Sequence, residues 1–240
     1  RPRARAAVQQ LRGAGIQVVM MTGDNRQTAH AIARDAGILD SKDDVVLDSD
    51  ELTRYSDQEV KRLLPHLRVV ARALPSDKSR LVRVAQQAGL VVGMTGDGIN
   101  DAPSLKGADV GFAMGSGTEV AKEAGDIVIL DDNISSIARA VLYGRTIFKS
   151  IRKFILFQLT TNFSAVAISI ICPFLGIDSP VTVLQMLWIN MIMDTFGSLA
   201  FAGEAPLTEY MCEAPKPKDE KILNRYMVKR MIFGAGYIIT

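Results

Sequence analysis

The 240-residue sequence has few cysteines, few aromatic residues and almost no excess charge of either sign. Its two cysteines, Cys172 and Cys212, provide neither a disulfide framework nor a zinc-site pattern. The formal net charge is only +2, so we expect no nucleic-acid partner. No G-x-x-x-x-G-K-[ST] motif occurs, which excludes a P-loop enzyme. The first residues show no signal-peptide pattern, and residue 1 is arginine rather than methionine, so we expect an interior piece of a larger membrane protein.

Charge is also missing from long stretches in the second half of the chain. Residues 154–177 contain no charged side chain, and residues 181–203 contain only Asp194. Both stretches are long enough to cross a bilayer, and a third apolar run begins near Met231. We therefore expect a multi-pass integral membrane protein in contact with a lipid bilayer.

The charges that flank these spans predict their orientation. Basic residues lie before the first span and after the second, at positions 145, 149, 152, 153, 216, 218, 221, 225, 229 and 230. Positive residues favour the cytoplasmic side, so the short connection at 176–180 should lie outside. We expect a cytosolic domain over residues 1–144 and a membrane region over 145–240.

The first part of the chain alternates short apolar runs with helical patterns. This alternation predicts an α/β fold with a doubly wound parallel sheet. Strands are expected at 16–21, 69–71, 89–94, 109–114 and 126–130, and helices at 2–13, 26–36, 56–64, 77–88 and 117–124. Residues 40–55 are polar and acidic, and we expect a surface excursion there. Ser76 is the expected cap of the helix at 77–88.

The loop after the run ending at Met94 carries a candidate magnesium–phosphate site. Gly96 and Gly98 bracket Asp97, so the backbone can turn sharply beside a ligand. If Asn100 opens a helix, Asp97 and Asp101 both project into the crevice at the strand's carboxyl end. Two clustered carboxylates favour a cation between them, and Mg²⁺ suits such a site together with a substrate phosphate. The competing interpretation is a tight turn without chemistry.

Two further loops should converge on this crevice. Thr22-Gly23-Asp24 follows a predicted strand, and Lys78 lies in the first turn of a predicted helix. A lysine there opposes the helix dipole but attracts phosphate, although a solvated lysine is the simpler explanation. A hydroxyl, a lysine and two carboxylates around one crevice are suited to phosphoryl transfer.

Polar residues within the spans form a second candidate site. Asp194 is costly at that depth, and Asn190 lies one turn earlier on the same helix face. Further oxygen atoms come from Thr160, Thr161, Asn162 and Ser164. Such a set suits a hard cation such as Ca²⁺, while a proton relay or hydrogen bonding between helices would use the same residues. Pro173 and Gly197 are expected to interrupt their helices, as at ion sites within membranes.

These motifs together resemble those of P-type cation-transporting ATPases, in particular Ca²⁺ pumps. Thr22-Gly23-Asp24-Asn25, Pro75-Ser76-Asp77-Lys78 and the run from Thr95 to Lys106 stand in the family's order. The resemblance covers essentially the whole chain. It implies the second half of a haloacid-dehalogenase-like phosphorylation domain, membrane helices 5 and 6, and the start of helix 7.

The resemblance also implies roles for individual residues. Asp97 is similar to the Mg²⁺ ligand, and Asn100 and Asp101 to residues completing the phosphate and Mg²⁺ environment. Three residues resemble contacts to the aspartyl phosphate: Thr22, Gly23 and Lys78. Asp24 resembles a carboxylate near the nucleotide and hinge. The transported Ca²⁺ would be bound by Asn162, Asn190 and Asp194. ATP would bind mainly in a domain outside this chain.

The sequence departs from the family pattern at several positions, and these departures restrict the activity and the ion stoichiometry that we expect. The phosphorylated Asp-Lys-Thr-Gly-Thr motif does not occur, so the isolated chain should be inactive. Ala165 and Met193 replace ligands of two-site pumps, which implies one Ca²⁺ per cycle, export from the cytosol and a plasma-membrane location. Three alternatives stay open: a pump for Mn²⁺, Na⁺ or H⁺, a non-catalytic membrane regulator, and a soluble phosphatase of the same superfamily.

Overall fold

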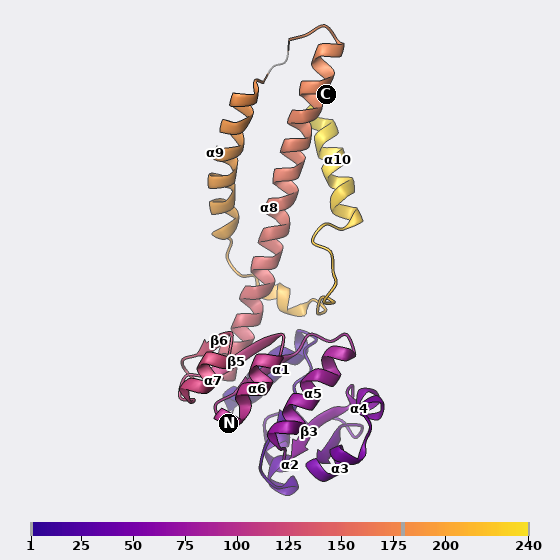
Figure 1. The fold of residues 1–240 in the computed structure, drawn as a ribbon, viewed down its shortest axis with the longest axis vertical. Helices are drawn as coiled ribbons and strands as arrows, with labels where there is room; N and C mark the ends of the chain where they lie inside the picture. Colours follow the sequence, from indigo (N-terminus) through magenta and orange to yellow (C-terminus); the bar gives the residue numbers. More distant parts are fainter. Residues whose placement is uncertain (1, 179–180, 240) are drawn as a thin grey trace. The chain divides into compact units, whose positions relative to one another are not determined.

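The computed structural model describes residues 2–178 and 181–239, with side chains from residue 4 onward. The chain forms two compact units. The first comprises residues 1–141 and 208–219, and the second residues 142–207 and 220–240 (Figure 1). The segment 208–219 therefore folds with the α/β unit although it connects two helices of the other unit.

Six described strands form two parallel three-stranded sheets, which confirms the predicted α/β class. The first sheet has the order β1-β3-β2, and the second β4-β5-β6. The strands are β1 (Met20–Met21), β2 (Val45–Asp48), β3 (Leu67–Ala71), β4 (Gly93–Gly96), β5 (Val110–Met114) and β6 (Ile127–Ile129). β1 is shorter than the apolar run at 16–21, and β4 is shifted toward the carboxyl end of the run at 89–94. In both cases the hydrogen-bonded pairing with the neighbouring strand covers only part of the run.

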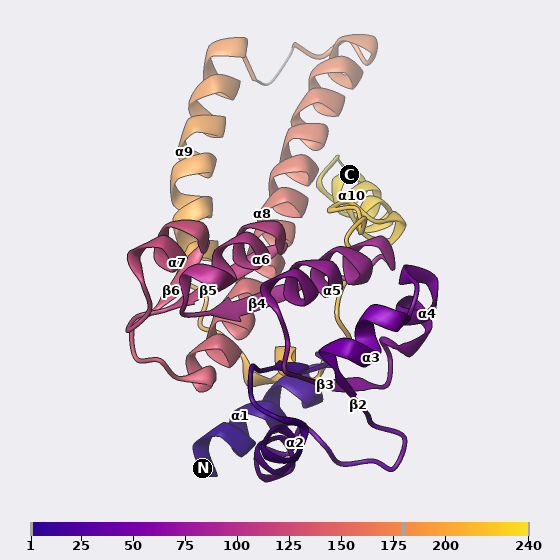
Figure 2. The same cartoon turned by 60° about the horizontal axis from the view of Figure 1, so that its bottom comes forward.

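Helices cover both faces of these sheets. The α/β unit contains α1 (Pro2–Gly13), α2 (Arg26–Asp35), α3 (Ser49–Arg54), α4 (Asp57–Leu63), α5 (Pro75–Gln87), α6 (Ala102–Gly107) and α7 (Glu119–Ala124). Figure 2 shows α5, α6 and α7 next to one another, and α6 and α7 contact the second sheet. On its other face, Phe112 and Ile129 pack against Ile137 near the start of α8 (Ile134–Phe174).

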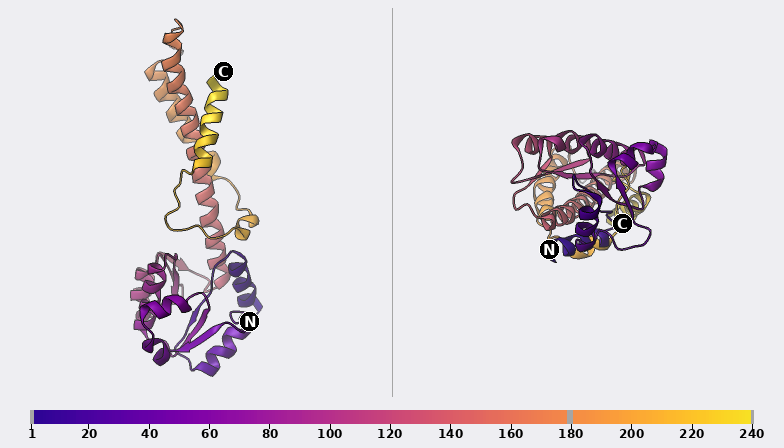
Figure 3. Two further views of the ribbon diagram at one scale, coloured as in Figure 1. Left: turned by 90° about the vertical axis from the view of Figure 1, so that its right-hand side faces the viewer. Right: turned by 90° about the horizontal axis from the view of Figure 1, so that it is seen from below.

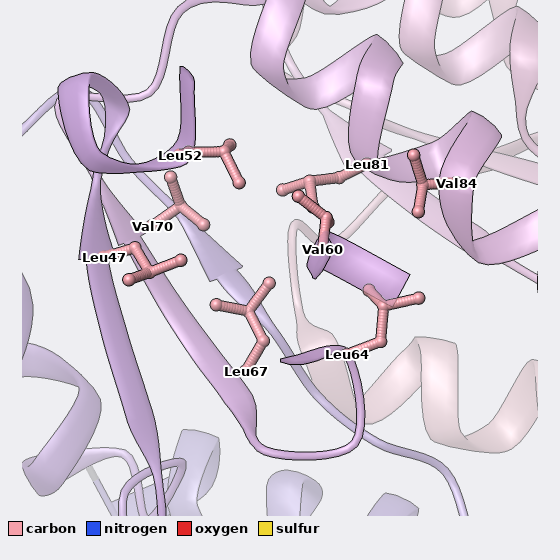
Figure 4. Packing of buried hydrophobic residues seen from close by; sticks show 8 residues of the cluster. All are labelled: Leu47, Leu52, Val60, Leu64, Leu67, Val70, Leu81 and Val84. Carbon is pink, nitrogen blue, oxygen red and sulfur yellow. The ribbon is translucent and has the colours of Figure 1, made fainter. Parts of the chain in front are cut away.

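The largest buried cluster lies between the first sheet and α3, α4 and α5 (Figure 4). Its members are Leu47, Leu52, Val60, Leu64, Leu67, Val70, Leu81 and Val84. α5 contributes Leu81 and Val84 here, and it contributes Val82 to a second cluster with Met94 and Leu105. Because α5 packs against both sheets, it fixes the position of Lys78 relative to the loop after β4.

The expected surface excursion at 40–55 is wrong. The segment contains β2 and α3, and it buries Leu47 and Leu52 in the core. The apolar run Val45–Leu47 is a short edge strand, and the Asp48 amide donates to the carboxylate of Glu51, which helps to start α3. The many acidic residues of this segment favoured a surface loop in the sequence analysis, although the short apolar run and the helix start are both present.

In the second unit, α9 (Val183–Ala202) and α10 (Arg225–Ile239) flank α8 (Figures 1 and 3). α8 and α9 are long and apolar enough to cross a membrane. α8 is continuous for 41 residues. Ser179 and Pro180, in the predicted outer turn, lie outside the described residues.

The two predicted helix interruptions are also wrong. α9 runs through Gly197, and Pro173 lies in the last turn of α8, one residue before its end. A Cβ atom at Gly197 would lie 3.3 Å from Cε1 of Phe157. The glycine thus provides space for an aromatic ring of the neighbouring helix, a common use of small residues in membrane helices.

Candidate active site in the α/β unit and polar residues of the membrane helices

The loop after β4 is folded tightly around Gly96. A Cβ atom at this position would lie 2.4 Å from Cβ of Asp101, so only glycine fits without rearrangement. A 3-10 turn over Ile99–Asp101 follows, and it leads directly into α6. This compact turn places Asp97 at the carboxyl end of a parallel strand, where open α/β sheets bind ligands.

Asp101 organises this loop from within. Its side chain is buried, and its Oδ1 accepts a hydrogen bond from Nζ of Lys78 at 2.6 Å. Its Oδ2 accepts hydrogen bonds from the backbone amides of Asp97 and Gly98, both at 3.3 Å. The expectation that both carboxylates project into the crevice is therefore wrong for Asp101, because this side chain turns inward to three donors.

Asp97 is exposed, and its carboxylate forms no hydrogen bond or ion pair within residues 2–178 and 181–239. Its backbone is held instead, because its carbonyl accepts a 2.8 Å hydrogen bond from the amide of Thr118. A Cβ atom at Gly117 would lie 2.8 Å from the same carbonyl oxygen, so this loop also approaches closely. The result is a closely packed, hydrogen-bonded backbone that leaves the Asp97 carboxylate exposed to solvent.

This arrangement fits a magnesium ion. Mg²⁺ binds through one or two carboxylates and completes its shell with water and substrate phosphate. The carboxylate of Asp97 is a hard oxygen donor available for this purpose. Within the described part of the chain there is no group of three or more His, Cys, Asp or Glu side chains that would suggest a fully protein-bound metal.

Lys78 is positioned by the capped start of α5. The expected Ser76 cap is wrong, because the helix begins at Pro75 and Asp77 makes the capping contacts. The buried carboxylate of Asp77 accepts hydrogen bonds from the amide of Leu74 at 2.9 Å and from the Ser49 hydroxyl at 2.6 Å. A carboxylate in the first turn also suits the helix dipole better than a hydroxyl does. The structure thus brings Lys78 together with Asp101, as the sequence predicted.

The Thr22-Gly23-Asp24 loop is tied to the end of β3. The Thr22 hydroxyl donates to the Asp24 carboxylate at 2.9 Å, and the amides of Arg72 and Ala73 donate to the carbonyls of Asp24 and Thr22. Like Asp97, this loop lies at the carboxyl end of parallel strands. Gly23 and Asn100 are exposed, and no hydrogen bond links the Thr22 loop to Asp97 within the described chain.

Arg72 is a residue at this edge that sequence reasoning missed. It is exposed, and its φ of 50° lies in the left-handed region, which non-glycine residues rarely occupy. Such strained residues cluster at functional sites. The only sequence signal is a basic residue directly after an apolar strand, since no glycine or asparagine marks the left-handed position.

The polar residues of the membrane helices separate into two groups. The hydroxyls of Thr160, Thr161 and Ser164 donate to backbone carbonyls one turn earlier in α8, so hydrogen bonding accounts for them. Asn162 and Asn190 are half-buried and Asp194 is exposed on α9. Within the described residues these three side chains form no hydrogen bond with one another.

Comparison with known proteins covers the whole chain. Residues 1–109 and 91–141 match models of haloacid dehalogenase-like hydrolases, and residues 178–240 match the model "Cation transporting ATPase, C-terminus". The chain is 43% identical to calcium-transporting ATPase 12, plasma membrane-type, of Arabidopsis thaliana, covering 100% of this chain and 24% of that protein. It is also 43% identical to plasma membrane calcium-transporting ATPase 3 of Rattus norvegicus, covering 100% of this chain and 20% of that protein.

A solved structure has a similar fold. The crystal structure of a zinc-transporting PIB-type ATPase in the E2.Pi state matches with a TM-score of 0.56 and 28% identity. The match covers 88% of this chain and 27% of that one. The chain thus spans about a quarter of the length of the proteins that it matches.

Proposed function

We propose that this chain, a segment homologous over its full length to P-type ATPases of the plasma-membrane calcium type, is part of an ATP-driven pump that exports Ca²⁺ from the cytosol. The observation that carries the proposal is the presence, in one chain, of the Lys78–Asp101 phosphate-site pair and a membrane helix with Asn190 and Asp194. The first suits phosphoryl transfer and the second suits a hard cation. ATP and Mg²⁺ are the expected reactants.

In this proposal the α/β unit handles an aspartyl phosphate. Asp97 would hold Mg²⁺, which neutralises phosphate charge when bound. Lys78 would contribute a positive charge to the phosphate, and Asp101 keeps that lysine in place through their 2.6 Å hydrogen bond. The Thr22 hydroxyl and the Gly23 amide would contact phosphate oxygens. Asn100 would help to complete the phosphate and Mg²⁺ environment, and Asp24 would lie near the nucleotide.

The phosphorylated aspartate would come from the remaining domains of the same pump, because no Asp-Lys-Thr-Gly-Thr motif occurs here. The unpaired edges of β1 and β4 among the described strands support this division. Within the described strands, β1 pairs only with β3 and β4 only with β5, so each has one unpaired edge. A parallel strand at these edges would end beside Thr22 and Asp97. The isolated chain should accordingly form no phosphoenzyme.

The membrane helices would bind one Ca²⁺ per cycle. Asp194 is the only acidic residue within α8 and α9, and Asn162 and Asn190 add neutral oxygens. Ala165 and Met193 lack the oxygen atoms that a second site would need. The basic residues flanking the two helices support a cytosolic α/β unit and an integral, multi-pass protein of the plasma membrane.

Transport of another cation is the second candidate, supported by the likeness to a zinc-transporting ATPase. The residues favour Ca²⁺, because Zn²⁺ prefers sulfur and nitrogen ligands and α9 contains no cysteine or histidine.

Phosphoenzyme formation from labelled ATP in the intact pump tests the choice of ion. We expect labelling with Ca²⁺ and little or none with Zn²⁺, Mn²⁺, Na⁺, K⁺ or no added ion. Labelling driven by another ion would overturn the calcium assignment. If a correctly folded pump is not labelled under any condition, a non-catalytic membrane regulator becomes the better explanation.

A further inference from the structure

Gln158 of α8 has an unusual environment for a polar residue. Its Oε1 is buried and finds no hydrogen-bond partner within residues 2–178 and 181–239. The neighbouring hydroxyls of Thr160 and Thr161 both donate to carbonyls of their own helix. In a bilayer no water replaces a missing partner, so a buried amide oxygen without one is costly. Its presence therefore calls for a ligand.

Helix geometry places Gln158 beside the candidate cation residues. Gln158 and Asn162 are four residues apart, so they share one face of α8 and lie about 6 Å apart along its axis. Asn190 and Asp194 have the same spacing on α9. Each helix thus carries two oxygen-bearing side chains, one turn apart.

The packing of α8 against α9 sets the height of these residues. The ring of Phe157 lies against Gly197, and the rings of Phe157 and Phe201 are 6.1 Å apart between centroids. The chain reverses between the two helices, which lie side by side (Figure 1). Because the two helices run in opposite directions, the residue three positions before Gly197 on α9 lies level with the residue three positions after Phe157 on α8. Asp194 is therefore at the height of residue 160, within about 3 Å of both Gln158 and Asn162 along the axis.

We propose that the carboxamide oxygen of Gln158 is a further ligand of the transported cation, on the side of Asn162 nearer to the basic end of α8. The inference rests on the proposed pump function. A Ca²⁺ ion takes six to eight oxygen ligands, and Asp194 alone supplies the negative charge in these helices, so neutral oxygens must complete the shell. Gln158 contributes such an oxygen without adding charge.

The test uses the intact pump and compares Gln158→Leu, Gln158→Glu and the control Thr160→Val. Thr160 belongs to the same turn, and its hydroxyl is satisfied within the helix. We measure the Ca²⁺ concentration that gives half-maximal phosphoenzyme. We expect Gln158→Leu to raise it tenfold or more with an unchanged maximum, whereas Gln158→Glu, which keeps an oxygen donor, stays within threefold of wild type, as does the control.

Two results would overturn the proposal. One is an unchanged half-maximal Ca²⁺ concentration in Gln158→Leu. The other is equal impairment of the leucine and glutamate variants, which would assign the amide group to hydrogen bonding with another helix. Should the leucine variant fail to fold, Gln158→Met, which also lacks the amide oxygen but keeps an unbranched side chain, takes its place in both comparisons. Failure of the pump function is distinct, because the wild-type protein would then show no Ca²⁺-dependent phosphoenzyme.

Discussion

The loop after β4 has little space for a larger side chain at Gly96. A Cβ atom at Gly96 would overlap the side chain of Asp101, which holds both Lys78 and the amide of Asp97. We expect Gly96→Ala to lower the free energy of unfolding by about 1–3 kcal/mol and to reduce phosphoenzyme formation strongly. Gly107→Ala is the control, since a Cβ there meets nothing within 4 Å. If Gly96→Ala and Gly107→Ala had the same unfolding temperature and the same phosphoenzyme yield, the loop around Gly96 would not be as tightly packed as its contacts indicate.

The Lys78–Asp101 pair is the second prediction at the residue scale. The two side chains are 18% and 9% exposed, so removing the lysine leaves a nearly buried carboxylate unpaired. We expect Lys78→Met to destabilise the pump by about 3 kcal/mol and to abolish phosphoenzyme formation. The double variant Lys78→Met with Asp101→Asn should recover much of the stability but not the activity. Recovery of activity in the double variant would show that Lys78 serves only to neutralise Asp101.

At the scale of elements, sequence patterns located most strands and helices but not their detailed pairing. The apolar runs before Thr22 and Asp97 identified two loops of the candidate phosphate site, because a buried strand that ends in a polar loop leaves a local signal in the sequence. Sequence patterns could not show that Asp101 turns inward while Asp97 stays exposed, since this depends on contacts with Lys78 from a distant helix. The same limit explains the missed left-handed Arg72 and the uninterrupted helix at Gly197.

The segment 208–219 gives a prediction about an element. Lys218 donates to Asp109 at 2.6 Å, Pro215 packs on Gly15, and Tyr210 is buried. Burial alone would raise the pKa of Asp109, but hydrogen bonds from Lys218, the Val92 amide and Gln86 outweigh it and hold the pKa below its ordinary value. Because its pKa is lower in the folded than in the unfolded protein, the Asp109 carboxylate stabilises the folded state at any pH above its unfolded-state pKa of about 4. This stabilisation is lost as the pH falls through the pKa of the folded state.

Hydrogen exchange of residues 208–219 in the intact pump checks this pairing. We expect Lys218→Met to weaken protection of the segment at neutral pH, with the nearby Lys221→Met as a control. Protection in the wild type should be constant between pH 6 and 8 and fall only below about pH 4. A loss of protection centred near pH 6 would contradict the role of the Asp109 carboxylate.

At the scale of the whole molecule, the proposed function requires phosphate chemistry in the α/β unit and ion binding in the membrane helices, and α8 connects the two units in sequence. α8 is a single helix from Ile134 to Phe174, with its first turn packed on the second sheet and its later turns in the membrane unit. Asp194 carries the only negative charge in α8 and α9. Replacing that carboxylate should therefore remove Ca²⁺ control of phosphorylation while leaving the α/β unit intact.

The most direct test is the Ca²⁺ dependence of phosphoenzyme formation in Asp194→Asn, measured beside the wild-type pump. We predict Ca²⁺-dependent labelling in the wild type and its loss in the variant across the full Ca²⁺ range, with normal thermal unfolding of both proteins. The same Ca²⁺ activation curve in both proteins would show that Asp194 does not bind the ion that controls phosphorylation.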